Sequence, residues 1–198
     1  GKVLPATLEN VDLKIFYEDG TSMVGEYHLD EELKQPKKIS FNKNDVSAYP
    51  KATEALVDAD LIVIGPGSLF GSVLPNLLIP EIKGALISNK WAMKVYVANC
   101  STERTQTAHF SVEDHIRVIF EHTKEKVFDY CLVNKKIIRQ SKRRKELGEI
   151  NNITTDKKVI DGVEVVLDDV ISEENPLFHD SAKLAKALLD LYNRVGRS

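Results

Sequence analysis

About a third of the way along, the chain reads Leu61-Ile62-Val63-Ile64-Gly65-Pro66-Gly67-Ser68. Four apolar residues, three of them β-branched, end abruptly at a turn that contains two glycines. A short continuous apolar run of this kind is typical of a strand buried on both faces, as in a parallel sheet with helices above and below. The stretch therefore predicts an α/β fold, with the glycine turn at the carboxyl end of a buried strand.

Strands and helices are expected to alternate around this stretch. We expect strands over residues 60–64, 94–98, 130–133 and 163–167, and helices over residues 50–57, 80–88, 181–194 and from Ser111 onward. Strand, loop and helix repeated in this order are the pattern of an α/β protein. Because no repeat, low-complexity tract or linker interrupts the pattern, we interpret residues 1–198 as a single domain.

The first thirty residues follow a different pattern. Apolar residues alternate with polar ones over residues 11–17 and again over residues 23–29, and Asp19-Gly20 lies between the two runs. A strand, a tight turn that contains glycine and a second strand predict a β-hairpin excursion near residues 11–29. The following polar segment, residues 34–43, contains Pro36 and is interpreted as a connecting arm.

The composition is that of an ordinary globular protein and argues against a mainly disordered chain. The 198 residues carry 27 basic and 30 acidic side chains, which gives a net charge of −3, and 42% are hydrophobic. This balance gives no reason to expect nucleic acid or an anionic membrane as a partner, and no apolar run is long enough to span a bilayer. No signal-peptide pattern is seen, and Cys100 and Cys131 are expected to be reduced and buried, so the protein is predicted to be cytoplasmic.

The glycine turn at residues 65–68 is the first candidate for a ligand site. Ligands of open α/β sheets gather at the carboxyl ends of strands, and the N–H groups of a glycine-rich turn can cradle a phosphate or diphosphate. A plain turn that binds nothing explains the local pattern equally well. A second candidate, the polar loop at residues 99–107, also follows a strand and could line the same crevice. Taken alone, this loop fits a solvated surface loop better.

No catalytic or metal-binding set emerges from the other polar residues. Ser68 lacks the G-x-S-x-G spacing of a nucleophile, and the five histidines lack metal-ligand spacing. The acidic pairs at residues 168–169 and 173–174 fit solvated turns better than a cation site. Residues 135–145 carry seven basic side chains without interleaved aromatics, and we interpret most of them as an exposed, neutralised face. We therefore predict no catalytic residue, no metal and no resident cofactor.

Several motifs, in order along the chain, together resemble one known family. They are Gly1-Lys2-Val3-Leu4-Pro5-Ala6-Thr7, Glu18-Asp19-Gly20, the run from Ala59 to Phe70 with Ser72, Leu74-Pro75-Asn76-Leu77-Leu78, and Asp114-His115-Ile116. The chain is similar to the bacterial gluconeogenesis factors of the YvcK type, in the CofD-like superfamily that also contains the phospholactate transferases. The similarity extends to the last helix and is most specific over residues 59–78.

The resemblance implies a Rossmann-like fold, a three-layer, mainly parallel sheet with helices on both faces. It also implies a cytoplasmic regulator, not a catalyst, that binds a UDP-sugar of the UDP-N-acetylglucosamine type at the strand ends. Such proteins are needed for growth and cell shape on gluconeogenic carbon sources. By matching motif, the expected ligand-binding residues are Gly65, Pro66, Gly67, Ser68, Leu69, Ser72 and Asn76, with Asn99 and Thr102 from the neighbouring loop.

The chain departs from the family pattern at several places. The family begins with a strand and a G-G-G-T-G phosphate loop, and we expect this N-terminal third of the pattern to be absent here. The second loop carries Ser101, Glu103, Thr105 and Gln106 in place of the family's Met, Gln, Gly and Glu. Lys145 replaces an aromatic residue, Phe178 replaces an arginine and Gly71 replaces a threonine. Together these changes predict weaker or altered ligand binding.

Three functions remain open on this basis. The first is a ligand-sensing regulator that acts on a cytoplasmic enzyme as its partner when the UDP-sugar is absent or present. The second is a transferase of the phospholactate type, which would require a guanosine nucleotide and Mg²⁺. The third is a scaffold that has lost the ligand and keeps only protein contacts. Self-association into a homo-oligomer is compatible with each of them.

Overall fold

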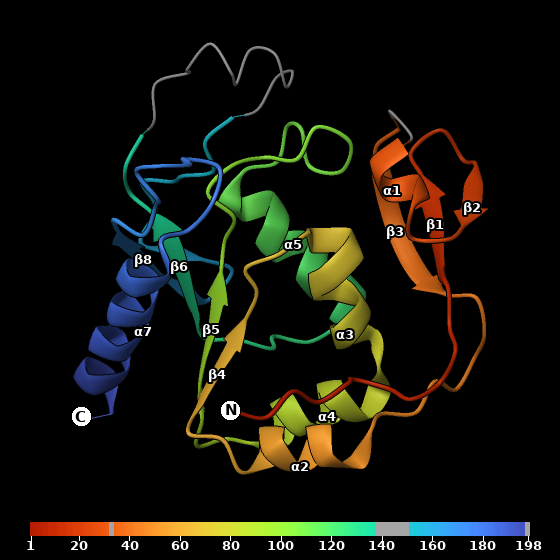
Figure 1. Ribbon diagram of the computed structural model, residues 1–198, viewed down its shortest axis with the longest axis horizontal. Coiled ribbons are helices and arrows are strands. Elements are labelled where there is room, and N and C mark those ends of the chain that lie inside the picture. Colours follow the sequence, from red (N-terminus) through yellow and green to blue (C-terminus); the bar gives the residue numbers. More distant parts are fainter. Residues whose placement is uncertain (32–33, 138–150, 197–198) are drawn as a thin grey trace.

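A five-stranded, mostly parallel sheet organises the molecule (Figure 1). The computed structural model describes residues 1–31, 34–137 and 151–196. The strands lie in the order β4 (Leu61–Ile64), β5 (Met93–Val97), β6 (Tyr130–Asn134), β8 (Val163–Asp168) and β7 (Val159–Ile160). All neighbours are parallel except β7, which pairs antiparallel with β8. The α/β sheet expected from the alternating pattern is confirmed.

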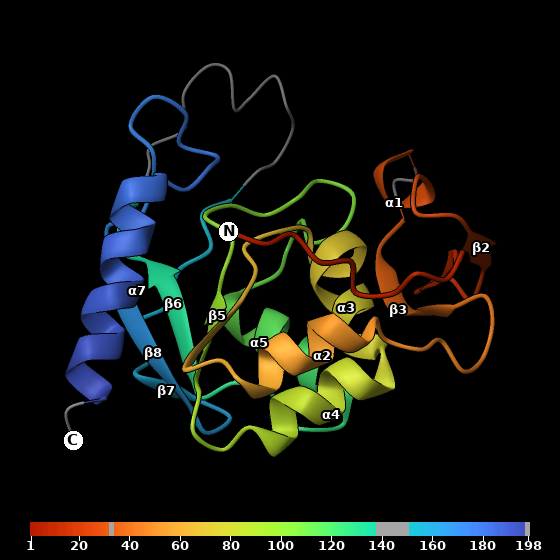
Figure 2. The same cartoon turned by 60° about the horizontal axis from the view of Figure 1, so that its bottom comes forward.

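Helices cover both faces of this sheet, so the fold has three layers (Figure 2). On one face, Leu191 of α7 (Ser181–Val195) packs in a cluster with Val95 and Leu132. The other face carries α3 (Leu74–Leu78), α4 (Pro80–Ser88) and α5 (Val112–Thr123). The three-layer arrangement implied by the family resemblance is therefore confirmed.

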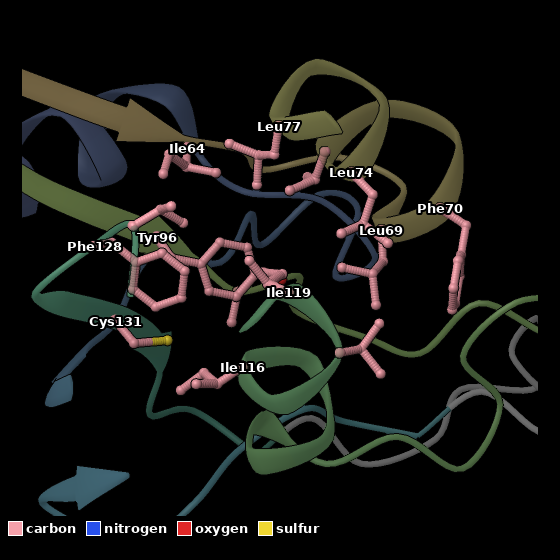
Figure 3. Close-up of a cluster of buried hydrophobic side chains, with 14 of the residues drawn as sticks. Ile64, Leu69, Phe70, Leu74, Leu77, Tyr96, Ile116, Ile119, Phe128 and Cys131 are labelled. Carbon is pink, nitrogen blue, oxygen red and sulfur yellow. The ribbon is translucent and has the colours of Figure 1, made fainter. Parts of the chain in front are cut away.

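The main core lies between the sheet and the layer that contains α5 (Figure 3). The rings of Tyr96 and Phe128 stack with their centroids 5.3 Å apart, and Ile119 of α5 belongs to the same cluster. Leu69 begins a turn of π-helix, η1 (Leu69–Val73), and its side chain is completely buried in this cluster. Because Leu69 directly follows the glycine turn, the core fixes the position of that turn.

A second, antiparallel sheet lies at the other end of the molecule from α7 (Figure 1). Its strands lie in the order β2 (Ser22–Val24), β1 (Leu13–Tyr17) and β3 (Pro36–Phe41). The predicted hairpin is confirmed, with Gly20 at a φ of 84° in its turn. It is shorter than expected, because the chain forms the short helix α1 (His28–Glu31) where the second strand was expected to continue.

The connecting arm expected over residues 34–43 is wrong, because most of this segment is strand β3. Its Ile39 is opposite Ile15 of β1, and both side chains are buried. The two exposed lysines that precede Ile39 hide the apolar alternation in the sequence. Pro36 is tolerated because it is the first residue of the strand, where a missing N–H costs least.

The burial expected for β4 on both faces is also wrong. Strand β4 is at the edge of the sheet, and the side chain of Val63 remains 38% exposed. The helix on that face, α7, packs on the central strands β5 and β6 and does not cover Val63. All five residues of β5, in contrast, are buried. An apolar run therefore indicates a strand correctly but does not distinguish an edge strand from a central one.

The predicted helices are confirmed, and a longer helical segment is added besides α1. Residues 50–57 form α2 (Pro50–Val57), and α5 begins with a capping box between Ser111 and Asp114. Helical structure also covers residues 69–78, which the sequence pattern does not predict. Pro75 is compatible with it because it occupies the first turn of α3, where no N–H donor is needed.

The helices were also compared with the length of a membrane span. Within the part of the chain that the structure describes, no single helix is long and apolar enough to cross a bilayer. The segments Leu69–Leu78 and Pro80–Ser88 reach the required length and apolar character only together, and a bend of 76° separates them. Leu69, Phe70 and Leu74 of this pair are buried in the core.

Candidate functional site

A hollow of about 640 Å³ opens at the carboxyl ends of β4 and β5. Three segments line it: the glycine turn after β4, the loop after β5 and the residues that lead into α7. The lining residues are Pro66, Gly67, Ser68, Asn99, Cys100, Ser101, Thr102, Glu103, Arg104, Leu177, Phe178, His179, Ser181 and Leu184. Small-molecule sites occupy roughly 300–1,000 Å³, so the hollow can hold a nucleotide-sized ligand.

The glycine turn needs a glycine at its first position. Gly65 has a φ of 80°, which is in the left-handed region that favours glycine. A Cβ at this residue would lie 3.1 Å from the carbonyl oxygen of Val97, at the end of the neighbouring strand. The turn therefore brings the backbone close to β5 in a way that no other residue type would allow without strain.

Asn99 holds the turn in place. The Gly67 N–H donates to Asn99 Oδ1 over 3.1 Å, and Asn99 Nδ2 donates to the Gly67 carbonyl over 3.0 Å. The expected phosphate cradle must be corrected in this respect, because the Gly67 N–H is already bonded. Within the described residues, the N–H groups of Ser68, Leu69 and Phe70 have no hydrogen-bond acceptor. Leu69 and Phe70 are completely buried and do not line the hollow, so the Ser68 N–H is the donor that the turn retains for an anion.

The side chain of Ser68 connects the turn to the second loop. Its hydroxyl accepts from the Gly71 N–H over 3.1 Å and donates to Gln106 Oε1 over 2.7 Å. Gln106 is only 3% exposed and donates in turn to Asp30 Oδ1 over 3.3 Å. The hydroxyl of Ser68 is therefore fixed from two sides and is oriented by the fold before any ligand binds.

The loop at residues 99–107 is not the solvated surface loop that its composition alone favours. Ser101, Thr102, Gln106 and Thr107 are all buried. Thr102 exchanges two hydrogen bonds with Asn151, one through its N–H and one through its hydroxyl, each 2.9 Å long. The expectation that this loop lines the same crevice as the glycine turn is confirmed.

Glu103 is the most unusual acid of the hollow. Its Oε2 atom is buried and has no hydrogen-bond partner within the described part of the chain. Burial raises the pKa of Glu103, the nearby Ser68 hydroxyl opposes this effect, and the negative charge of Asp30 adds to it. A carboxyl group in these surroundings holds its proton more readily than an exposed one and can donate it or bind a hydroxyl group.

His179 lies on the opposite side of the hollow, where the chain leads into α7. Burial lowers the pKa of His179, so the neutral ring is favoured, and its Nε2 atom has no partner among the described residues. The adjacent Phe178 is 62% exposed and Arg104 is also exposed. The hollow thus combines an aromatic face, a positive charge, a buried acid and a neutral histidine.

The structure separates the nine predicted site residues into three groups. Pro66, Gly67, Ser68, Asn99 and Thr102 line the hollow just described. Gly65, Ser72 and Asn76, with Pro66 shared, line a second hollow of about 640 Å³ that is mostly apolar and lies along β4. Leu69 is completely buried and lines neither of the two hollows.

The charged clusters singled out in the sequence pair with one another. Lys135 Nζ lies 3.3 Å from Asp168 Oδ1, and Lys183 Nζ lies 3.5 Å from Asp169 Oδ2. Arg139 and residues 142–146 and 149 lie outside the described residues, so the rest of the predicted basic face is not placed. In the described part of the chain, no group of three or more His, Cys, Asp or Glu side chains could hold a metal ion.

Sequence reasoning did not identify Glu103, Gln106 and His179 as members of the site. Glu103 and Gln106 belong to the polar loop, but nothing local shows that they turn inward. His179 is separated from the glycine turn by more than one hundred residues and precedes Asp180, the N-cap of α7. One feature of the sequence could have pointed to them. Glu103 and Gln106 follow β5 and His179 precedes α7, and the ends of these elements meet at one edge of the sheet.

Comparison with known proteins shows the family of this chain. A family model described as 2-phospho-L-lactate transferase CofD matches residues 1–171. The chain belongs to the CofD family. Among relatives of this CofD-family chain, the gluconeogenesis factor of Listeria monocytogenes is 38% identical over 191 residues, and that of Bacillus subtilis is 34% identical over 195 residues. Each alignment covers 96% of this chain, and 59% and 61% of the two relatives, respectively.

Solved structures show the same CofD-family fold. Two crystal structures of a protein from Bacillus halodurans, one of them described as a member of the UPF0052 family, superpose with TM-scores of 0.88 and 0.85. Both are 33% identical in sequence, and the superpositions cover 96% of this chain and 62% of theirs. The chain therefore spans about three fifths of the length of these relatives.

Proposed function

We propose that this CofD-family protein binds a UDP-sugar of the UDP-N-acetylglucosamine type and acts as a regulator during growth on gluconeogenic carbon sources. The observation that carries the proposal is the meeting of the glycine turn, the polar loop and Phe178 at one hollow. Two relatives that bear the name gluconeogenesis factor support the role in growth. In this proposal the protein works in the cytoplasm, where it contacts an enzyme and influences cell shape.

Each part of a nucleotide sugar has a matching surface in the hollow. The diphosphate is placed at the Ser68 N–H, which the glycine turn retains, with Arg104 as its positively charged neighbour. The uracil ring stacks on the exposed face of Phe178, which takes over the role of the aromatic residue that Lys145 replaces. The sugar hydroxyls hydrogen-bond to Glu103 Oε2 and His179 Nε2, the two atoms among the described residues of the hollow that are buried and lack partners. Asn99 and Thr102 position the backbone and need not touch the ligand.

A transferase is the second candidate, and one observation favours it beyond the family description. Glu103, whose pKa is raised, and His179, whose pKa is lowered, line the same hollow. Both shifts favour the neutral form of the group. An acid that keeps its proton and a histidine that stays unprotonated are candidates for a general acid and a general base. In that case the protein would turn over a nucleotide donor and would require Mg²⁺.

A thermal-shift panel distinguishes these functions. The melting temperature is measured with UDP-N-acetylglucosamine, UDP-glucose, GDP and GTP, each with and without Mg²⁺. A ligand at about one hundred times its dissociation constant adds roughly 2.7 kcal/mol of stability, which is easily detected. A shift with UDP-sugars alone is the expected result. A Mg²⁺-dependent shift with guanosine nucleotides would favour the transferase instead. No shift with any nucleotide would favour a scaffold that has lost ligand binding.

Two variants tie the result to the hollow. Gly67→Val places a branched side chain where a Cβ already approaches Ser72 Cβ to 3.3 Å, and it should abolish the shift in a protein that still folds. Phe178→Ala removes the stacking surface and should weaken binding by about 1–3 kcal/mol. Tyr27→Ala is the matched control, because Tyr27 is an aromatic residue that is 59% exposed and does not line the hollow. Unchanged affinity in both site variants would contradict the placement of the ligand.

A further inference from the structure

A smaller hollow, of about 420 Å³, lies at the amino ends of the strands, on the side of the sheet away from the proposed ligand site. It is formed where β4, β5 and β6 begin and where α7 ends, and both views show these parts at the same end of the molecule (Figures 1 and 2). Its side chains are mostly aromatic and acidic. The lining residues are Asp60, Trp91, Ala92, Met93, Asp129, Tyr130, Tyr192, Val195 and Gly196.

The backbone of Trp91, at the rim of this hollow, is held by a hydrogen bond while its side chain is exposed. It is the only tryptophan of the chain and is 95% exposed. The neighbouring Asn89 is buried, and its Oδ1 accepts from the N–H groups of Trp91 and Ala92 over 3.1 and 2.9 Å. Asn89 Nδ2 lies 2.9–3.0 Å from the carbonyl oxygens of residues 56, 57 and 59. The fold thus fixes the loop and directs a large apolar side chain into solvent.

The electrostatic surroundings of the hollow are negative. Asp60 and Asp129 are the only charged residues among the lining side chains of the described chain. Lys126 pairs with Asp129 over 3.0 Å. Burial raises the pKa of Tyr130, and the charges of Glu164 and Asp129 raise it further, by more than Arg194 and Lys126 lower it. The acidic groups therefore outweigh the basic ones at this aromatic ring.

We propose that this hollow binds an arginine side chain presented by a basic segment of a partner protein. Aromatic rings attract cations through the negative charge of their faces, and a guanidinium group stacks on such rings while it pairs with a carboxylate. Among the described residues Asp60 has no basic partner, and Tyr130 and Tyr192 supply the aromatic rings of the hollow. Phosphate-bearing partners are disfavoured because the two carboxylates repel them.

The exposure of Trp91 indicates why the occupant is a protein and not a free small cation. A small cation in the hollow would leave the outer face of the indole ring in water. A folded or extended polypeptide that contributes the arginine also covers Trp91, and tryptophan is among the residue types that dominate binding energy at protein interfaces. The site lies at the opposite end of the sheet from the nucleotide hollow, so its occupation does not depend on the proposed function.

The fluorescence of Trp91 provides the test, because no other tryptophan contributes to the signal. A blocked basic peptide with a central arginine is titrated into the protein, and the same peptide with citrulline is the probe without the charge. We expect a saturable change in emission with the arginine peptide and at least tenfold weaker binding of the citrulline peptide. The variants Asp60→Asn and Tyr192→Ala should each weaken binding of the arginine peptide about tenfold.

Asp58→Asn is the matched control for this experiment. It removes the same kind of charge two residues from Asp60 but outside the hollow, and it should leave peptide binding unchanged. Equal binding of the two peptides, the absence of saturation, or equal affinity of the Asp60→Asn variant and the unaltered protein would each overturn the proposal. The thermal shift with UDP-N-acetylglucosamine should remain in all these variants, so failure here is distinguishable from failure of the nucleotide site.

Discussion

Asn99 and Gly67 exchange two hydrogen bonds, so that one side-chain amide joins the loops that follow two adjacent strands. The Gly67 N–H donates to Asn99 Oδ1, and Asn99 Nδ2 donates back to the Gly67 carbonyl. The amide forms the pair of hydrogen bonds that the backbone of a neighbouring strand would form, at a place where β4 and β5 have already ended. The arrangement determines which N–H groups of the glycine turn are still available to a ligand.

The variant Asn99→Ala should separate the two loops. It leaves the N–H and the carbonyl of Gly67 without partners, which should lower the free energy of unfolding by about 1–3 kcal/mol. Binding of UDP-N-acetylglucosamine should weaken as well, because the turn loses its fixed shape. Chemical denaturation and calorimetric titration measure the two effects.

Asn42→Ala is the matched control for this change. Asn42 also exchanges two hydrogen bonds with a single residue, Asp12, but the pair is exposed and lies near the small sheet. Its loss should change stability by less than about 1 kcal/mol, because water replaces the lost bonds. If both variants behaved alike and bound the nucleotide normally, the Asn99–Gly67 pair would have no role at the site.

Gly65 and Gly84 should respond in opposite directions to the same substitution. Gly65→Ala forces a Cβ into a residue with a φ of 80° and to 3.1 Å from the Val97 carbonyl, and it should destabilise by at least ~1 kcal/mol. Gly84 is in the interior of α4, with nothing within 4 Å of an added Cβ. Gly84→Ala should therefore stabilise the protein by about 0.5–1 kcal/mol. A thermal denaturation series on both variants checks the signs.

The sequence predicts those elements whose stability is local. The four parallel strands of the main sheet and helix α2 follow from apolar runs and from a proline that can begin a helix, whereas the two-residue strand β7 does not follow from such a pattern and is not predicted. Strand β3 does not, because two lysines interrupt its alternation and its stability comes from pairing with Ile15 of β1. The edge position of β4 could not be predicted from the sequence either. The exposure of Val63 depends on the packing of α7, which lies more than one hundred residues further along the chain.

The candidate site also contains features that depend on local sequence and features that depend on tertiary packing. The glycine turn is local, and its position after a strand places it at the ligand edge of the sheet. The pairing of Gln106 with Ser68, in contrast, joins residues 38 positions apart. His179 reaches the hollow only because α7 crosses the sheet on the face opposite α5. Such partners follow from tertiary packing, for which a single sequence has no periodic signal.

The thiol of Cys131 should be inert in the folded protein. Cys131 is completely buried in β6, and burial, with a smaller effect of Glu113, raises the pKa of its thiol to about 12. The thiolate is the reactive form, so at roughly pH 8 a thiol reagent should not modify it in the native state. Mass spectrometry should find the modification only after unfolding in concentrated guanidinium chloride. Rapid labelling of Cys131 under native conditions would contradict its placement in the core.

Glu103→Gln should make stability less dependent on pH. The folded state raises the pKa of Glu103 above its ordinary value of 4.5, mainly through burial, so the folded protein binds a proton that the unfolded chain releases in that range. Stability is therefore lost as pH rises from about 4.5 through the raised pKa and stays reduced above it. The variant removes this loss, and its melting temperature should exceed that of the unaltered protein at about pH 8 but not at about pH 4.

Glu81→Gln is the matched control, because Glu81 is in the first turn of α4, is exposed and lies outside the hollow. It should show no such gain at the higher pH. A nucleotide sugar that hydrogen-bonds to Glu103 should also bind the glutamine variant less tightly, although the variant is the more stable protein. Stability and binding would then change in opposite directions, which a merely structural role of Glu103 does not produce. Equal melting temperatures of variant and unaltered protein at both pH values would show that Glu103 is hydrated.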